Sequence, residues 1–281
     1  MHRLAEIETA LRANTKIDGA GYTEEIMYID GPKGPMFAAL LLPVGRAPSA
    51  ALIVCPSLFE LATLQPTELL FLRRAATEGF AGIYVQPPGV GESAGDPGET
   101  RMSDRIEAAD AGLRELSLRF PKTPRCYFGA RLGAAVALRA AGTGEATGLV
   151  AWDPVFEAEG YLRQIRRLAR ISAIAGGSSA FRDPLHRLRE TGRVSILGNV
   201  VTALQIEDLS AVEVSDPVVE GPVLVVAMGE RSRTAATERL THAGDLEVIE
   251  LEGRDLAGLG MSVREAPHAI TPTIEWMKRK F

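Results

Sequence analysis

The chain has 281 residues, with 31 Lys and Arg against 36 Asp and Glu, so its formal net charge at pH 7 is −5 with histidine neutral. Hydrophobic residues make up 46% and charged residues 24%, which is ordinary usage for a globular protein large enough to bury a core. The mild acidity argues against a general nucleic-acid-binding protein, and no apolar stretch reaches the roughly 18 residues of a membrane-spanning helix.

The first residues of the chain and its two cysteines indicate in which cellular compartment the protein works. Arg3, Glu6 and Glu8 interrupt the region where a signal peptide would need an apolar run, so we expect a cytoplasmic protein. Cys55 and Cys126 are too few for a disulfide framework, and no Cys and His residues have the spacing of zinc ligands. Neither a metal nor a cofactor is predicted.

Most of the chain is predicted to alternate between strands and helices. After an amphipathic helix at 4–13, two strands joined by a turn are predicted at 24–30 and 36–43, and the apolar run at 50–55 is typical of a strand buried on both faces. Further helices are predicted at about 67–78, 103–119, 132–141, 234–241 and 270–280. Further strands are predicted at 82–85, 125–128, 148–152, 222–227 and 246–251. This alternation indicates an α/β protein with a mainly parallel sheet and helices on both faces.

One segment, from Pro154 to Asp216, interrupts this alternation and is predicted to be mostly helical. An insertion of this size in an open sheet usually covers the carboxyl edge of the strands, where ligands bind. We therefore expect residues 1–153 and 217–281 to form one α/β core, and residues 154–216 to form a helical cap inserted after the strand that ends at Trp152.

The most informative segment runs from Arg125 to Ala135, where a strand turns sharply into a helix with Gly129 and Gly133 on either side of Arg131. In a nucleophile elbow, G-x-S-x-G, this geometry pushes the central side chain out over the sheet. A guanidinium stays protonated at any working pH and has no lone pair with which to attack, so Arg131 cannot replace the serine. Two interpretations are open: Arg131 binds a carboxylate or phosphate in the cleft, or it pairs with a neighbouring acid of the protein.

With this elbow the sequence resembles the α/β-hydrolase superfamily from about Thr23 onward. In that superfamily the loop after the third strand supplies an amide of the oxyanion hole. By this resemblance, the loop at 55–60 supplies the oxyanion-hole amide. The amides of Ser57, Leu58 and Leu132 would then donate hydrogen bonds to negative charge that develops on the substrate. The implied fold is a mostly parallel sheet flanked by helices, the α/β-hydrolase fold.

More narrowly, the sequence is similar to the hydrolase-like proteins associated with exosortases. These also tend to have arginine at the elbow, here Arg131, and a Trp-Asp-Pro-Val stretch, here residues 152–155, followed by a tyrosine and a leucine, here Tyr161 and Leu162. The loop at 89–93 matches the superfamily pattern G-x-G-x-S. The resemblance implies a biosynthetic accessory protein, and it is much more specific for the fold than for any reaction.

The resemblance also implies where the acid and the histidine of a catalytic triad should be. The acid should follow the predicted strand at 222–227, where Glu230 is the candidate. Asp255 stands about where the histidine should be, and His268 comes later, as either a displaced general base or a structural residue at the start of the last helix. All three triad positions depart from the usual residues, which argues against Ser-His-Asp hydrolysis.

Three other features have competing interpretations. Residues 89–94 match G-x-G-x-x-A, but no helix opens directly from these glycines, so a tight loop is favoured over a nicotinamide site. Ser57 and Cys55 are two further candidates for a nucleophile at another position. Either would need an adjacent base, and the sequence does not identify one. Asp153 is a general base, the ionic partner of Arg131, or a turn residue before proline.

Four arginines recur at helical spacing within the predicted cap, and they lie on one face of a helix. They are Arg163, Arg166, Arg167 and Arg170. A solvated face is the usual explanation for such a pattern. The alternative is recognition of an anionic carrier, such as an acyl carrier protein or the phosphates of coenzyme A.

These features favour a non-serine enzyme with acyl-type chemistry. Its substrate would be a small carboxylated or acyl molecule, free or linked to a carrier, anchored by Arg131 between sheet and cap. Asp153, Glu230 or Asp255 would supply acid/base chemistry. One alternative is a catalytically silent family member that binds a ligand or partner, for example as a homodimer. Another is an esterase or thioesterase with a relocated nucleophile. Nucleic acids and membranes are not expected partners.

Overall fold

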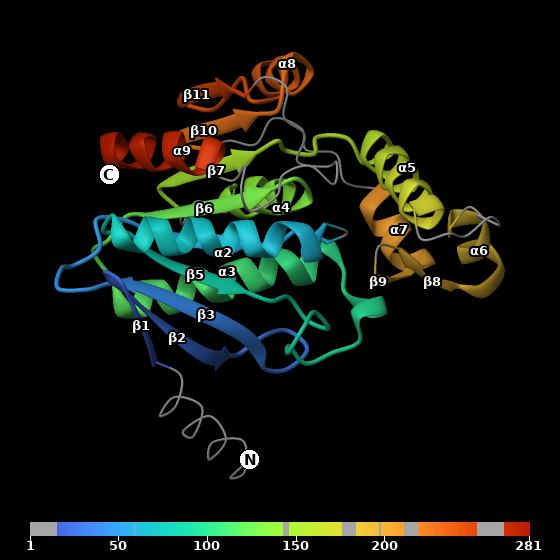
Figure 1. Ribbon diagram of the computed structural model, residues 1–281, viewed down its shortest axis with the longest axis horizontal. Helices are drawn as coiled ribbons and strands as arrows, with labels where there is room; N and C mark the ends of the chain where they lie inside the picture. Colours follow the sequence, from blue (N-terminus) through green and yellow to red (C-terminus); the bar gives the residue numbers. More distant parts are fainter. Residues whose placement is uncertain are drawn as a thin grey trace, which may run out of the picture.

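A nine-stranded sheet forms the centre of the protein (Figure 1). The computed structural model describes residues 16–58, 60–142, 146–175, 184–196, 198–210, 219–251 and 267–281. The strands of the sheet are β1 (Lys16–Gly19), β2 (Tyr22–Ile29), β3 (Met36–Pro43), β4 (Ala51–Cys55), β5 (Ala81–Val85), β6 (Arg125–Ala130), β7 (Gly148–Trp152), β10 (Pro222–Ala227) and β11 (Asp245–Glu250). Their order across the sheet is β1-β2-β3-β5-β4-β6-β7-β10-β11. The pairs from β1 to β5 are antiparallel and the pairs from β5 to β11 are parallel, which confirms the predicted, mainly parallel sheet.

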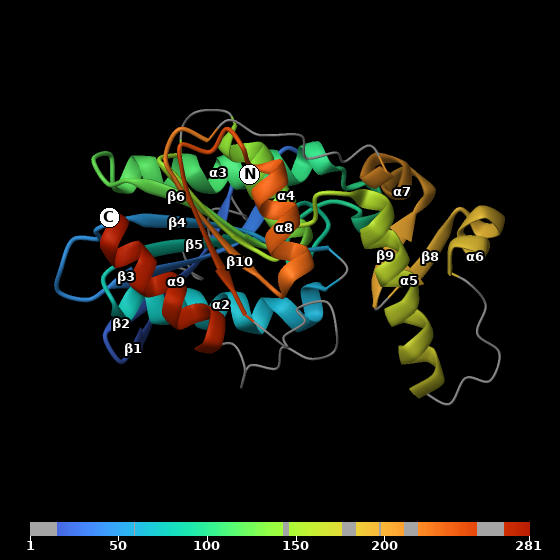
Figure 2. The same cartoon turned by 90° about the horizontal axis from the view of Figure 1, so that it is seen from above.

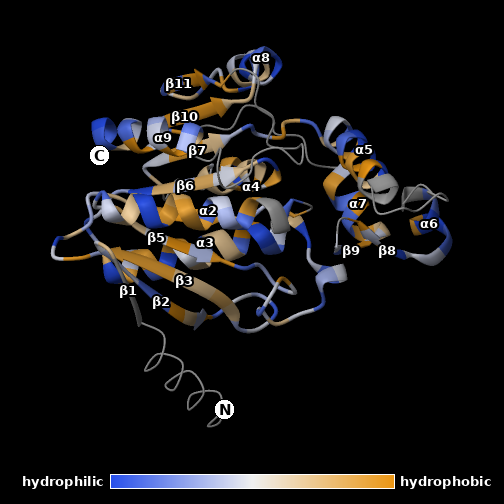
Figure 3. Cartoon of the chain, in the orientation of Figure 1, coloured by the Kyte–Doolittle hydropathy of each residue, from blue (hydrophilic) through white to orange (hydrophobic). Residues whose placement is uncertain are grey.

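Helices cover both faces of this sheet (Figure 2). One face is covered by α2 (Leu61–Thr77) and α9 (Pro267–Lys280). The other face is covered by α3 (Met102–Arg119), α4 (Leu132–Ala141) and α8 (Glu230–Arg239). The central parallel strands are buried on both sides, and their sequences are therefore mostly continuous apolar runs (Figure 3). The edge strand β11 is the exception, with exposed or half-buried residues throughout.

Aromatic packing fixes the strands that end at the elbow. Phe71 of α2 lies 4.5 Å from Phe128 of β6 and 5.3 Å from Trp152 of β7, measured between ring centroids. Phe128 and Trp152 are 4.8 Å apart in an edge-to-face arrangement. The indole N–H of Trp152 donates a hydrogen bond of 3.0 Å to Thr273 of α9. Fully buried aromatic pairs of this kind are among the strongest packing contacts in a core, so they hold the ends of β6 and β7 in place.

The segment at 154–216, between β7 and β10, is called the inserted segment below, and its described elements lie beyond the carboxyl ends of the parallel strands (Figure 1). Its described elements are α5 (Ala158–Ala175), α6 (Pro184–Thr191), β8 (Arg193–Ile196), β9 (Asn199–Thr202) and α7 (Ala203–Ser210). Besides its three described helices, this segment contains an antiparallel hairpin of β8 and β9 that was not predicted. Alternation of buried and exposed residues along β8 is the period-2 pattern that signals such a strand.

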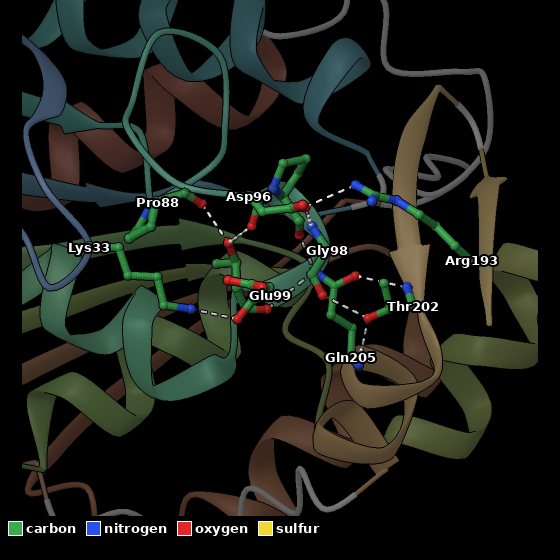
Figure 4. A network of polar contacts seen from close by, with 10 residues as sticks. Lys33, Pro88, Asp96, Gly98, Glu99, Arg193, Thr202 and Gln205 are labelled. Carbon is green, nitrogen blue, oxygen red and sulfur yellow. Dashed lines mark hydrogen bonds and ion pairs between the residues drawn. The ribbon is translucent and has the colours of Figure 1, made fainter.

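A network of hydrogen bonds joins the inserted segment to the loop after β5 (Figure 4). Gln205 of α7 is buried, and its side-chain N–H groups donate to the carbonyls of Pro97 at 2.6 Å and Thr100 at 3.2 Å. Thr202 donates to the carbonyl of Gly98 at 2.7 Å. Pro97 and Gly98 belong to a short 3₁₀ helix, η1 (Pro97–Glu99). These contacts fix the inserted segment against the α/β core.

We predict that Gln205→Ala lowers the free energy of unfolding by about 2 kcal/mol, because it leaves buried backbone carbonyls without their donors. Urea denaturation of the variant and the parent measures the change. Glu207→Ala, an exposed position on the same helix, is the matched control and should change stability little. Equal effects at the two positions would show that the network does not hold the inserted segment.

Several boundaries differ from the predicted ones. α2 begins at Leu61 and contains Pro66, whereas the sequence prediction started the helix after that proline. α8 begins at Glu230, earlier than predicted, and β1 was not predicted. The predicted helix at 4–13 lies outside the described residues. Within the described part of the chain, no helix is both long enough and apolar enough to span a membrane.

Candidate functional site

A sharp turn between β6 and α4 places Arg131 at the carboxyl edge of the sheet. Its backbone angles are φ 56° and ψ −121°, a strained conformation for a residue with a side chain. A Cβ atom on Gly133 would lie 2.0 Å from the carbonyl oxygen of Cys55, and one on Gly129 would lie 2.2 Å from the carbonyl oxygen of Gly133. Only glycine fits at both positions, so the geometry of a nucleophile elbow is present with arginine at its centre.

The guanidinium of Arg131 is surrounded by groups of the protein itself. Its Nη1 donates a hydrogen bond of 2.7 Å to Oδ2 of Asp153, and its Nη2 donates to Oε1 of Gln164 in α5. Its Nε lies 3.6 Å from Oε1 of Glu60, and its central carbon lies 5.7 Å from the centre of the Tyr161 ring. The side chain is 8% exposed. Two carboxylates, an amide and an aromatic face therefore share one buried cation.

These neighbours keep Arg131 charged despite its burial. Desolvation alone would lower the pKa of the guanidinium, but Asp153, Glu60 and Tyr161 outweigh it and raise the pKa above its ordinary value. Arg131 is therefore a permanent cation, which agrees with the chemical argument that it cannot act as a nucleophile. Its charge is balanced inside the protein by Asp153 and Glu60.

Asp153 directly follows β7. Of the three roles considered for it from the sequence, the structure shows an ion pair with Arg131. It also has a positive φ of 45°, and its amide donates to the carbonyl of Val226 at 2.8 Å. The amide of Val155 donates to the carbonyl of Arg131 at 3.3 Å, and the amide of Arg131 donates to the carbonyl of Trp152 at 2.9 Å. The Trp-Asp-Pro-Val stretch is thus bonded directly to the elbow.

Glu60 is a central residue of the site that sequence reasoning missed. Its Oε2 accepts hydrogen bonds from the hydroxyls of Ser57, at 2.7 Å, and Tyr161, at 2.5 Å. Burial raises the pKa of Tyr161 well above its ordinary value, and the charge of Glu60 raises it further. The available signal was an acid three residues after Ser57, at the end of the loop at 55–60. The structure places this carboxylate within hydrogen-bond distance of the Ser57 hydroxyl.

Cys55, the other proposed relocated nucleophile, is buried at the end of β4. Burial raises the pKa of its thiol well above the ordinary value, and the charges of Asp110 and Glu68 raise it further. The thiolate is the reactive form of cysteine, so a buried, protonated thiol is a poor nucleophile. Leu58 and Leu132, whose amides are the predicted oxyanion donors, are buried in the core beside the elbow.

Two of the remaining predicted residues, Glu230 and His268, lie at exposed positions. Glu230 is the exposed first residue of α8, and His268 is exposed near the start of α9. Asp255 lies outside the described residues. Among the residues that the structure describes, no group of three or more His, Cys, Asp or Glu side chains is arranged to hold a metal ion.

The cap arginines share one exposed face of α5, as their spacing predicts. The exposed residues are Arg163, Arg166, Arg167 and Arg170. Arg163 forms an ion pair with Glu159 one turn earlier. The opposite face of the helix directs Tyr161 and Ile165 into the interior, where Tyr161 reaches Glu60. This helix therefore contributes Tyr161 and Gln164 to the site and presents its arginines to solvent.

No protein-family model and no curated protein sequence matches the chain. Solved structures do: a hypothetical protein, PA2218, from Pseudomonas aeruginosa is 16% identical, with a TM-score of 0.67 over 95% of this chain and 96% of that one. Est1E from Butyrivibrio proteoclasticus, solved with ferulic acid bound, is 14% identical, with a TM-score of 0.63 over 90% and 98%. XC6422 from Xanthomonas campestris, an α/β serine hydrolase without a lid, is 15% identical, with a TM-score of 0.57 over 90% and 94%. Together with the parallel sheet and the elbow, these similarities show that the chain has the α/β-hydrolase fold.

Proposed function

We propose that the chain is a non-serine enzyme on the α/β-hydrolase fold that acts on a small carboxylated or acyl substrate at the carboxyl edge of the sheet. The observation that carries the proposal is the position of Arg131. A buried, permanently charged guanidinium occupies the centre of the elbow, so the usual acyl-serine intermediate cannot form there. A cation at this position favours binding or polarising an oxygen of the substrate.

Gln164 gives the substrate a route to Arg131. It is the neutral member of the three side chains that contact the guanidinium nitrogens, and it comes from the inserted segment. A substrate oxygen that replaced the Gln164 oxygen at Nη2 would leave both ion pairs, with Asp153 and Glu60, in place. Losing a neutral partner costs far less than leaving a buried carboxylate unpaired, so this exchange is the one that the contacts favour.

Asp153 and Glu60 are the acid/base groups that lie next to this position. Asp153 accepts a hydrogen bond from Arg131, and Glu60 accepts two hydrogen bonds from hydroxyl groups. The amides of Ser57, Leu58 and Leu132 would bind developing negative charge on the substrate, as the resemblance implies. The cap arginines and the narrower resemblance to exosortase-associated proteins support a carrier-linked acyl substrate, with a cap formed by residues 154–216.

A second candidate function is an esterase or thioesterase with Ser57 as nucleophile. The contact that favours it is the 2.7 Å hydrogen bond from the Ser57 hydroxyl to Glu60, because a serine needs an adjacent base. Against it, the same carboxylate faces Arg131, and Ser57 is only 1% exposed. A catalytically silent, ligand-binding protein is supported by the internal charge balance of Arg131.

Hydrolysis of a panel of p-nitrophenyl esters and acyl thioesters separates these functions. The proposed enzyme should turn over at least one carboxylated or acyl substrate, Arg131→Met should lose that activity, and Ser57→Ala should retain about half of it or more. Circular dichroism checks that both variants are folded. Activity lost in Ser57→Ala but kept in Arg131→Met would identify the relocated nucleophile. Unchanged ligand binding with a lower melting temperature in Arg131→Met would make Arg131 a structural residue.

A further inference from the structure

A second group of buried polar side chains lies at the carboxyl edge of the sheet, in addition to the site around Arg131. It consists of Arg105 near the start of α3, Tyr84 near the end of β5 and Glu68 in α2. Their exposed fractions are 4%, 1% and 0%. Within the described part of the chain, Nη1 and Nη2 of Arg105, the Tyr84 hydroxyl and both carboxyl oxygens of Glu68 have no hydrogen-bond partner. Buried polar atoms are nearly always paired, so these atoms are free to form hydrogen bonds with a ligand.

These side chains lie near enough for their charges to act on one another. Burial raises the pKa of Tyr84 well above its ordinary value, the charge of Glu68 raises it further, and the charge of Arg105 lowers it. Burial, with a smaller effect of Glu60, raises the pKa of Glu68 to about 8, so this carboxyl is mainly neutral at pH 7. Burial lowers the pKa of Arg105 to about 10, so the guanidinium is still charged. The group therefore has a net positive charge.

The carboxylates around Arg105 have other partners. Burial has the largest effect on the pKa of Arg105 and lowers it; Tyr161 has the largest opposite effect, and Asp104 and Asp208 also raise this pKa. Asp104, however, forms an ion pair of 2.8 Å with Lys33. Asp208 accepts a hydrogen bond of 2.6 Å from the amide of Met102. Within the described part of the chain neither carboxylate accepts a hydrogen bond from Nη1 or Nη2 of Arg105, so these two nitrogens stay available to an incoming anion.

We propose that Arg105 and Tyr84 bind a small carboxylate at a second anion site, separate from Arg131. The planar guanidinium presents two parallel N–H donors to the two oxygens of a carboxylate, and the phenol adds a third donor. One positive charge matches one carboxylate charge, whereas a phosphate dianion would bring a second, uncompensated charge into buried surroundings. The site does not depend on any chemistry at the elbow, and it goes beyond the proposed function.

Thermal unfolding of the full chain in acetate, with acetamide as a neutral probe of the same shape and at constant ionic strength, tests this site. Acetate should raise the melting temperature of the parent in a concentration-dependent way, and acetamide should not. Arg105→Met should weaken acetate binding by roughly a hundredfold, and Tyr84→Phe by about tenfold. Arg114→Met, an exposed position on the same helix, is the matched control and should behave like the parent.

The variants also separate this site from the elbow. Acetate binding that is kept in Arg131→Met and lost in Arg105→Met supports the second site. Binding that is kept in Arg105→Met and lost in Arg131→Met overturns it and leaves the anion at the elbow. No acetate effect on the parent also overturns it, even if ester or thioester turnover is found. If Arg105→Met does not fold, Tyr84→Phe decides: unchanged acetate affinity contradicts the proposal.

Discussion

Asp153→Asn is expected to lower the free energy of unfolding by about 3 kcal/mol, because it removes the carboxylate that balances a buried guanidinium. Asparagine keeps the shape of the side chain and tolerates the positive φ at this position, so the change tests the charge and not the turn. Among the residues that the structure describes, Arg131 would retain only Glu60, at 3.6 Å, as an ionic partner. Urea denaturation at neutral pH measures the loss.

The double variant Arg131→Met with Asp153→Asn shows whether the loss comes from this pair. Removing both partners should cost less than the sum of the two single changes, since neither member of the Arg131–Asp153 pair is then left buried without the other. Glu157→Gln is the matched control: it breaks an exposed ion pair with Arg239 and should cost less than about 1 kcal/mol. A loss at Asp153 no larger than that of the control would mean that the Arg131–Asp153 pair does not stabilise the fold.

Glu68→Gln is expected to remove a pH dependence of stability worth about 3 kcal/mol between about pH 5 and pH 8. Burial and the charge of Glu60 raise the pKa of Glu68 from 4.5 to about 8 in the folded protein. Between these two values the folded state binds a proton that the unfolded state has lost. Stability therefore falls as the pH rises through this window, and it levels off above it.

The measurement is the free energy of unfolding of the parent and of Glu68→Gln at several pH values within that window. Cys55 and Tyr84 have pKa values raised above the window, and the histidines are the same in both proteins, so the difference reports Glu68 alone. Glu107→Gln, an exposed position on α3, should leave the pH dependence as it is. Parallel pH profiles for the parent and Glu68→Gln would show that Glu68 is ionised in the folded protein.

The sheet and the elbow were predictable from sequence because both depend on short local patterns. Continuous apolar runs identify strands buried on both faces, and alternation with helices implies parallel pairing. The glycines around Arg131 identify the elbow because Gly129 and Gly133 leave no room for a Cβ atom. Boundaries were less accurate where proline occurs inside a helix, as at Pro66 in α2.

The site around Arg131 was only partly predictable, because its members come from distant parts of the chain. Asp153 could be proposed as a partner, since the carboxyl ends of neighbouring parallel strands meet at one edge of the sheet. Glu60 and Gln164 could not, because their approach to Arg131 depends on how α2 and the inserted segment pack. That Nη1 and Nη2 of Arg105 have no hydrogen-bond partner in the described part of the chain depends on the whole surrounding structure and has no sequence signature.

Intact-mass spectrometry after incubation with a fluorophosphonate probe tests most directly whether Arg131 has replaced the attacking residue of this fold. Without a nucleophilic serine the mass of the protein should stay unchanged, in the parent and in Ser57→Ala alike. A mass increase by one phosphonyl group that disappears in Ser57→Ala, or that maps to any other residue beside Arg131, would contradict the assignment.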